Sequence, residues 1–153
     1  MTAVTDAALG VVRAVVEVAA SPDKVWRALT DPNELEAWWG SGDAYKTFDW
    51  KSDLRPNGER SCRARAPGRE ELSTVEGEYV MVEPPRLLEF TWRASWDPHG
   101  ETRVRMELDP VPAGTRVTVI HSGFGEDAKR TGGYADGWTR VLGWLSARMA
   151  SGS

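Results

Sequence analysis

The sequence is poor in the residues that build disulfides and metal centres. It has one cysteine, Cys62, and two histidines, His99 and His121, which lie in separate segments. A single cysteine excludes an internal disulfide and fits a reducing compartment. Because there is neither a cysteine pair nor a His-x-x-x-His spacing, we expect no metal site and no other cofactor.

Long apolar runs and an excess of positive charge are also missing. No apolar stretch approaches the length of a transmembrane helix, so membrane insertion is not expected. Residues 1–9 lack a basic start and a continuous apolar run, and no signal peptide is expected. The formal net charge of −4 argues against nucleic acid as a partner. We therefore expect a cytoplasmic protein.

Tryptophan is abundant by contrast. The chain of 153 residues holds eight of them: Trp26, Trp38, Trp39, Trp50, Trp92, Trp96, Trp138 and Trp144. Such rings serve a core, and so much rigid aromatic surface also suits a ligand cavity. The length predicts one domain, placed at residues 10–150, with a flexible tail over 1–9 and a short tail over 151–153.

The first half of the predicted domain begins with a strand and two short helices. Residues 11–19 alternate apolar and polar side chains, which predicts a strand. Ser21 precedes a proline and predicts the start of a helix over 22–29. Asp31 also precedes a proline and predicts the start of a second helix over 32–38. Glu34 is positioned to form a capping box with Asp31.

The middle of the chain, residues 45–121, predicts strands separated by turns. Asn57-Gly58 is a hairpin signal. Strict alternation over 88–93 and 102–108 predicts an antiparallel sheet with one buried face, which needs a cover. An apolar stripe at helical spacing supplies it, formed by Tyr134, Trp138, Val141, Leu142, Leu145 and Met149. The order of one strand, two helices, six strands and one helix predicts an α+β fold, in which a curved antiparallel sheet wraps around a long C-terminal helix.

The chain resembles a known superfamily across residues 11–149. The matching segments are Ala20-Ser21-Pro22, Leu29-Thr30-Asp31-Pro32, Trp38-Trp39, Phe48-Asp49, Gly77-Glu78-Tyr79, Glu83-Pro84-Pro85-Arg86-Leu87, Gly114-Thr115-Arg116, His121-Ser122-Gly123-Phe124 and Gly137-Trp138. They are similar to the START-like and birch-pollen-allergen-like helix-grip domains (SRPBCC), in the branch named after the activator of the heat-shock chaperone ATPase. Asn57-Gly58 departs from the family's usual Gly-Gly pair, and asparagine also tolerates the left-handed backbone of such a turn.

The resemblance implies the helix-grip fold and a cavity between the sheet and the long helix, but no single activity. Our leading hypothesis is that the cavity binds a hydrophobic or aromatic small molecule or a lipid. One alternative is an enzyme of the polyketide cyclase/dehydratase or hydrolase type, and whether the protein is an enzyme stays open. Another is a chaperone-associated interaction module. The resemblance also implies a role in bacterial stress response or metabolism. The oligomeric state stays open, with a homodimer as one option.

The expected cavity residues are mostly aromatic: Trp39, Tyr45, Trp50, Met81, Trp92, His121, Phe124, Tyr134 and Trp138. His121 has two readings, since its imidazole suits a base or a group that orients a ligand, and equally a core histidine bonded to backbone. No catalytic residue is assigned.

Other charged groups are read as structural. Asp49 is expected to bond loop backbone or an arginine, and Glu76 and Glu78 to lie on a solvated face. Cys62 is expected to be an unreactive strand residue. The basic strip of Arg60, Arg63, Arg65 and Arg69 is expected on the solvated face of a hairpin.

Overall fold

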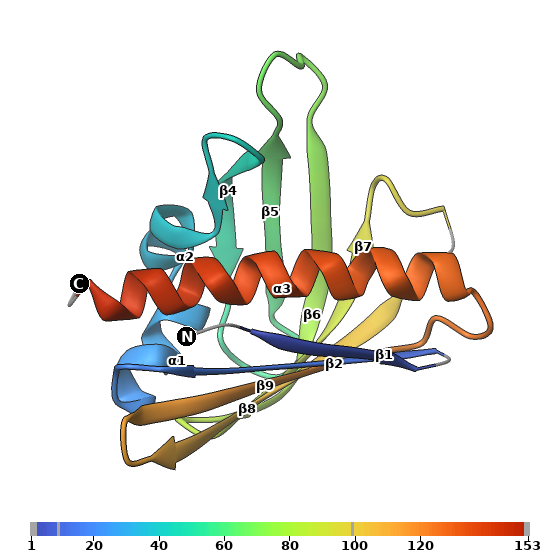
Figure 1. The fold of residues 1–153 in the computed structure, drawn as a ribbon. Coiled ribbons are helices and arrows are strands. Elements are labelled where there is room, and N and C mark those ends of the chain that lie inside the picture. Colours follow the sequence, from blue (N-terminus) through green and yellow to red (C-terminus); the bar gives the residue numbers. More distant parts are fainter. Residues whose placement is uncertain (1–2, 9, 99, 152–153) are drawn as a thin grey trace.

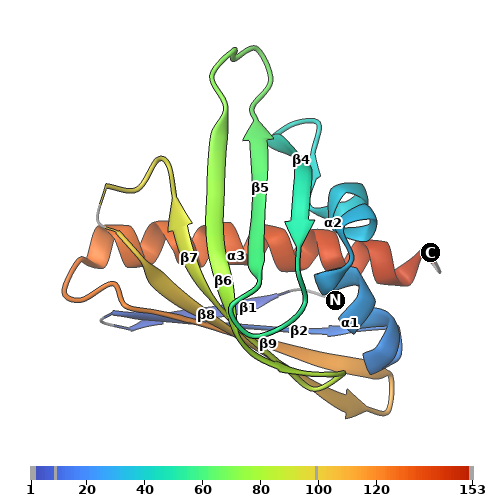
Figure 2. The ribbon, with the colours of Figure 1, turned by 180° about the vertical axis from the view of Figure 1, so that it is seen from behind.

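A curved nine-stranded sheet grips one long helix. The computed structural model describes residues 3–8, 10–98 and 100–151. Neighbouring strands are antiparallel, in the order β1-β2-β9-β8-β7-β6-β5-β4-β3. Helix α3 crosses the inner face of the sheet (Figure 1), and from behind the strands lie in front of it (Figure 2). The α+β helix-grip fold predicted from the sequence is confirmed.

The elements have the following bounds. The strands are Val4–Ala8 (β1), Val11–Val18 (β2), Gly40–Ser41 (β3), Tyr45–Ser52 (β4), Glu59–Arg65 (β5), Ser73–Glu83 (β6), Leu87–Ala94 (β7), Thr102–Val111 (β8) and Gly114–Ser122 (β9). The helices are Pro22–Thr30 (α1), Pro32–Trp38 (α2) and Ala128–Ala150 (α3).

Two strands were not predicted. Residues 4–8, expected within a flexible tail, form β1 and pair with β2 from Val4↔Val15 to Ala8↔Val11. This edge strand is mostly exposed, so it lacks the apolar alternation by which strands are recognised. Strand β3 has two residues and pairs with β4. Ser151 forms a turn, and the rest of the expected C-terminal tail lies outside the described residues.

The alternation in the sequence places side chains as expected. Every second residue of β2, from Val12 to Val18, is buried, and so is every second residue of β8 from Thr102 to Leu108. Helix α3 buries Trp138, Val141, Leu142, Leu145 and Met149 against this face. Burial of apolar surface thus joins sheet and helix.

Asp31 connects α1 to α2. Its N–H donates to the Arg27 carbonyl and ends α1, while its carboxylate accepts from the N–H groups of Asn33 (2.8 Å) and Glu34 (3.5 Å) and begins α2. The predicted capping box does not form, because that N–H is already bonded within α1. The Glu34 carboxylate instead lies 3.6 Å from Arg148 of α3. The short helices are thereby tied to the end of the long one.

The turn between β4 and β5 forms as Asn57-Gly58 predicted. Asn57 has a left-handed φ of 70°. A Cβ on Gly58 would lie 1.9 Å from the Asp53 carbonyl oxygen, so this position requires glycine. In the described part of the chain, no helix is long and apolar enough to cross a membrane.

Candidate functional site

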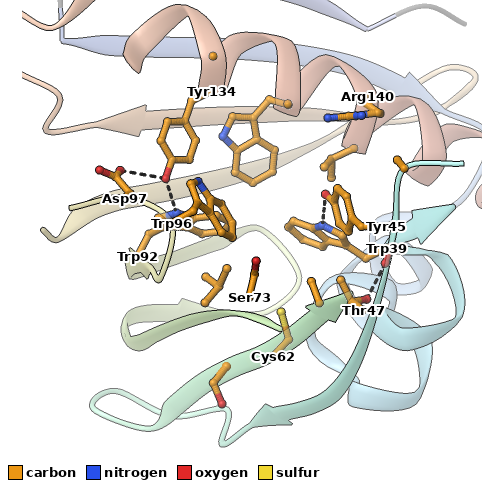
Figure 3. Close-up of a pocket in the computed structure, with 18 of the residues that line it drawn as sticks. Trp39, Tyr45, Thr47, Cys62, Ser73, Trp92, Trp96, Asp97, Tyr134 and Arg140 are labelled. Atoms are coloured by element: carbon orange, nitrogen blue, oxygen red, sulfur yellow. Dashed lines mark hydrogen bonds between the residues drawn. The ribbon is translucent and has the colours of Figure 1, made fainter. Parts of the chain in front are cut away.

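A cavity of about 880 Å³ lies between α3 and the inner face of β4–β7. Figure 3 shows α3 above it and the strands below. Its described lining residues are Trp39, Ala44, Tyr45, Thr47, Trp50, Arg60, Ser61, Cys62, Ala64, Ala66, Ser73, Val75, Phe90, Thr91, Trp92, Trp96, Asp97, Pro98, Asp127, Lys129, Arg130, Gly133, Tyr134, Gly137, Trp138, Arg140 and Val141. This volume is within the range of small-molecule sites, about 300–1,000 Å³.

Small side chains explain why the space is open. Strand β5 presents Cys62 and Ala64 at alternate positions, with Ala66 directly after its end. Helix α3 contributes Gly133 and Gly137 to the opposite wall, where an added Cβ would meet no atom within 4 Å. Neither wall therefore fills the gap between them.

Tryptophans form an aromatic part of the wall. The Trp138 ring lies edge-on to Trp39, with centroids 5.8 Å apart, and 6.0 Å from Trp92. Trp39 also lies 5.4 Å from Trp50 and donates from its indole to the Tyr45 hydroxyl at 3.3 Å. Contacts of this kind fix the ring orientations and create a rigid, apolar surface.

Six of the nine expected residues line the cavity, namely Trp39, Tyr45, Trp50, Trp92, Tyr134 and Trp138. Met81 does not, and is 36% exposed. The pairing of β6 with β7 shifts register between Tyr79 and Met81, so alternation counted along β6 fails there. Trp96 was not expected, but it lines the cavity while 54% exposed.

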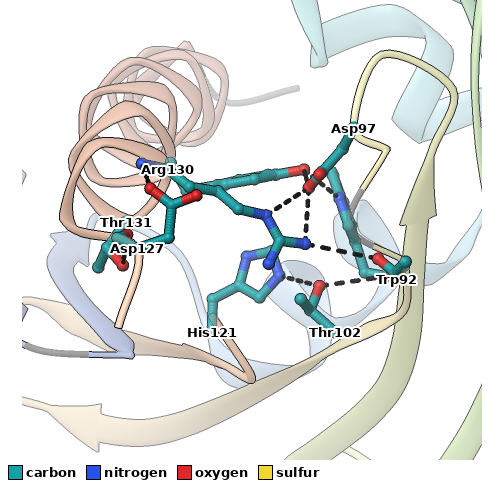
Figure 4. A network of polar contacts seen from close by, with 9 residues as sticks. Trp92, Asp97, Thr102, His121, Asp127, Arg130 and Thr131 are labelled. Atoms are coloured by element: carbon teal, nitrogen blue, oxygen red, sulfur yellow. Dashed lines mark hydrogen bonds and ion pairs between the residues drawn. The ribbon is translucent and has the colours of Figure 1, made fainter. Parts of the chain in front are cut away.

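His121 lies outside the wall and is fully buried. The Trp138 indole N–H donates to its Nδ1 at 3.0 Å, and its Nε2 lies 2.7 Å from the Thr102 hydroxyl (Figure 4). Because an indole only donates, the neutral ring carries its proton on Nε2. Burial, with a smaller contribution from the positive charge of Arg130, lowers the pKa of His121 to about 3 against the opposing effect of Asp97.

The reading of His121 as a ligand-facing group or base is therefore wrong. The core reading holds, except that the ring bonds side chains and not backbone. Phe124, also expected in the cavity, is buried with its ring centroid 4.7 Å from that of His121 and 4.9 Å from that of Tyr134. Both residues support the wall from behind.

Two of the residues that line the cavity, Arg130 and Asp97, form an ion pair (Figure 4). The Arg130 guanidinium contacts the Asp97 carboxylate at 2.8 Å, and the Tyr134 hydroxyl donates to the same carboxylate at 3.1 Å. The Trp92 indole in turn donates to the Tyr134 hydroxyl at 3.2 Å. Burial, more than the neighbouring carboxylate, raises the pKa of Tyr134 to about 12. The network ties the segment after β7 to the first turns of α3.

Arg60 is the functional candidate that the sequence reading missed. It was expected on a solvated face, yet it is only 5% exposed and lines the cavity. Position 60 has the same parity as Cys62 and Ala64, so strand alternation gave the signal. The exposed Arg63, Arg65 and Arg69 lie away from this wall, as expected.

The remaining charged candidates are structural. Asp49 pairs with Arg63 at 3.5 Å, and Glu76 and Glu78 are exposed, all as expected. Burial raises the pKa of Cys62 to about 12 and outweighs the opposite effect of Arg60, so the thiol is not activated. In the described segments, no cluster of three or more metal-ligating side chains occurs.

The chain was compared with known families and curated proteins. The family described as Activator of Hsp90 ATPase homolog 1-like protein matches residues 19–150. A search among curated proteins finds no match for the chain.

Solved structures share the fold over nearly the whole chain. A Rhodobacter sphaeroides protein is similar with a TM-score of 0.87 and 21% identity, covering 99% of each chain. An AHSA1 protein from Silicibacter pomeroyi has a TM-score of 0.78 and 24% identity, covering 94% of this chain and 99% of its own. A Chromobacterium violaceum protein has a TM-score of 0.80 and 23% identity, covering 92% and 97%. At these identities the likeness establishes the fold alone.

Proposed function

The chain belongs to the family of Activator of Hsp90 ATPase homolog 1-like proteins, within the SRPBCC superfamily, and from this premise we propose that it binds a hydrophobic or aromatic small molecule in the cavity. The superfamily is in general a scaffold for small hydrophobic ligands. The observation that carries the proposal is the cavity of about 880 Å³ with its tryptophan wall.

Enclosure between rigid rings would supply the affinity. Burial of about 200 Å² of apolar ligand surface, at ~25 cal/mol per Å², contributes about 5 kcal/mol before the cost of association. The rings of Trp39, Trp92 and Trp138 are held by their mutual contacts and by the hydrogen bonds that their indole N–H groups donate to Tyr45, Tyr134 and His121. Little ordering cost is then left for the binding step.

Binding is preferred over the two alternatives. The enzymatic hypothesis needed His121 beside a carboxylate in the open pocket, and His121 lies behind the wall. The chaperone-associated hypothesis rests on the family's description. We further propose a cytoplasmic location, which the single buried thiol of Cys62 supports.

Two glycines on α3 offer a matched test. Gly137 lines the cavity and Gly143 does not, and an added Cβ at either position would meet open space. Gly137→Leu should fill part of the cavity and weaken binding of the neutral fluorophore 1-pyrenebutyramide at least tenfold. Gly143→Leu should leave its affinity unchanged. Energy transfer from tryptophan to pyrene measures both.

Both substitutions should raise the free energy of unfolding, since leucine favours a helix over glycine by up to about 1 kcal/mol. Loss of binding in Gly137→Leu thus could not be attributed to unfolding. Equal affinity of the two variants, or no binding to the wild type, would refute the proposed function.

A further inference from the structure

Arg60 places a buried cation at the wall of the cavity. Its guanidinium carbon lies 4.4 Å from the ring centroid of Phe90 and 5.4 Å from that of Trp50, and both rings line the cavity. A third ring, Tyr79, lies 5.8 Å away. An arginine packed among rings keeps a fixed position and is weakly hydrated.

One of its two terminal nitrogens is satisfied and the other is not. Nη1 donates to the Leu29 carbonyl oxygen at 2.8 Å and to the Tyr79 hydroxyl at 2.9 Å. Nη2 is buried and has no hydrogen-bond partner. In the described ranges 3–8, 10–98 and 100–151, no carboxylate forms an ion pair with Arg60. A buried guanidinium without a counter-charge is costly, so this group calls for an anionic partner.

The charges around the cavity favour such a partner. Its described lining residues include four cations, Arg60, Lys129, Arg130 and Arg140, and two carboxylates, Asp97 and Asp127. Asp97 is already paired with Arg130. The chain as a whole carries −4, so the positive balance is local to this wall.

We propose that the ligand is a carboxylic acid with an apolar, ring-bearing body, and that its carboxylate pairs with the Arg60 guanidinium. Nη2 has almost no exposed surface in this structure, so the guanidinium turns slightly towards the cavity when the carboxylate binds. This inference rests on the proposed function, because it names the class of molecule that the cavity takes. The ligand's body would lie against the tryptophan wall, and the hydrogen bonds of Nη1 keep the guanidinium beside that wall. A charge-assisted bond of this kind is stronger than one between neutral groups.

Arg60 also has a structural role, which the test must separate. Its bond to Leu29 satisfies a carbonyl in the last turn of α1, where a cation is favourable. Loss of this bond would weaken binding of any ligand through the fold. The decisive readout is therefore a ratio of affinities for two probes of the same shape.

The probes are 1-pyrenebutyrate and its neutral amide, 1-pyrenebutyramide, titrated at pH 7 by energy transfer from tryptophan. The wild type should bind the carboxylate at least tenfold more tightly than the amide. Arg60→Met should bring this ratio close to one while the amide still binds. Arg63→Met removes the same charge from an exposed position on the same strand, outside the cavity wall, and should keep the wild-type ratio. Arg60→Gln, which keeps an amide donor, replaces Arg60→Met if the latter does not fold.

Each outcome decides the matter. A wild type that binds both probes equally would overturn the inference and leave the proposed function standing. A preference that survives Arg60→Met or Arg60→Gln, and is lost in Arg140→Met, would place the carboxylate at the rim and also overturn it. Failure of the wild type to bind either probe would overturn the proposed function and this inference together.

Discussion

His121 shows how one buried polar residue shapes a wall that it does not enter. It accepts from Trp138, and its Nε2–H donates to Thr102, whose hydroxyl donates to the Trp92 carbonyl at 3.3 Å. Two wall tryptophans are thus fixed through a single imidazole. The arrangement requires the neutral ring, because protonation of Nδ1 would break the bond to Trp138.

The neutral state of His121 makes stability depend on pH. Its pKa is about 3 in the fold against 6.5 in the unfolded chain, so the unfolded state binds more protons between these values. The stabilisation is present above pH 6.5 and is lost as the pH falls towards 3. Between pH 7 and 5 the wild type should lose about 2 kcal/mol more than His121→Gln, measured by urea unfolding.

His99 is present in both proteins, so its titration cancels in this comparison. Equal loss of stability in wild type and variant would show that His121 is not held neutral by the fold.

At the residue level, the sequence predicted well which face of the sheet a side chain lies on, but it predicted poorly which residues that side chain contacts. Alternation placed Trp92 and His121 on the inner face, but it does not say that Trp138 from the distant helix covers His121. The prediction that Met81 lines the cavity was wrong, because nothing in the sequence marks the register shift in β6. Arg60 was misjudged because it was grouped with neighbouring arginines by charge, although its parity matched Cys62.

Among the elements, the junction of α1 and α2 was largely readable from the sequence. Helix caps are local, so Ser21 and Asp31 mark the two starts without knowledge of the fold. The partner of Glu34 was not readable, since Arg148 lies at the far end of the chain. The edge strand β1 could not be predicted, because a mostly exposed strand lacks the alternation of apolar and polar residues.

Asp31 should therefore matter more than its exposure suggests. Asp31→Ala removes the side-chain acceptor for two N–H groups at the start of α2, and should cost about 1–2 kcal/mol in free energy of unfolding. Asp31→Asn keeps an acceptor and should cost much less. Glu36→Ala, an exposed change in the same helix, is the control. The cap has no such role if Asp31→Ala and Glu36→Ala unfold at the same urea concentration.

At the scale of the whole molecule, the cavity exists because the side chains of the sheet and the helix do not fill the space between them. The sheet curves around α3, yet β5 presents small side chains and α3 presents Gly133 and Gly137 where they face each other. Unfilled space and helical glycines both lower stability. The chain gives up this stability in the region that the proposed function needs, as sites of binding often do.

The eight tryptophans test the central claim directly. Five line the cavity, Trp39, Trp50, Trp92, Trp96 and Trp138, and three do not, Trp26, Trp38 and Trp144. Each indole N–H gives its own signal in a ¹H–¹⁵N spectrum, assigned by single Trp→Phe changes. On addition of 1-pyrenebutyramide the five cavity signals should shift, and the other three should move little. Shifts spread evenly over all eight signals, or confined to the latter three, would contradict binding in the cavity.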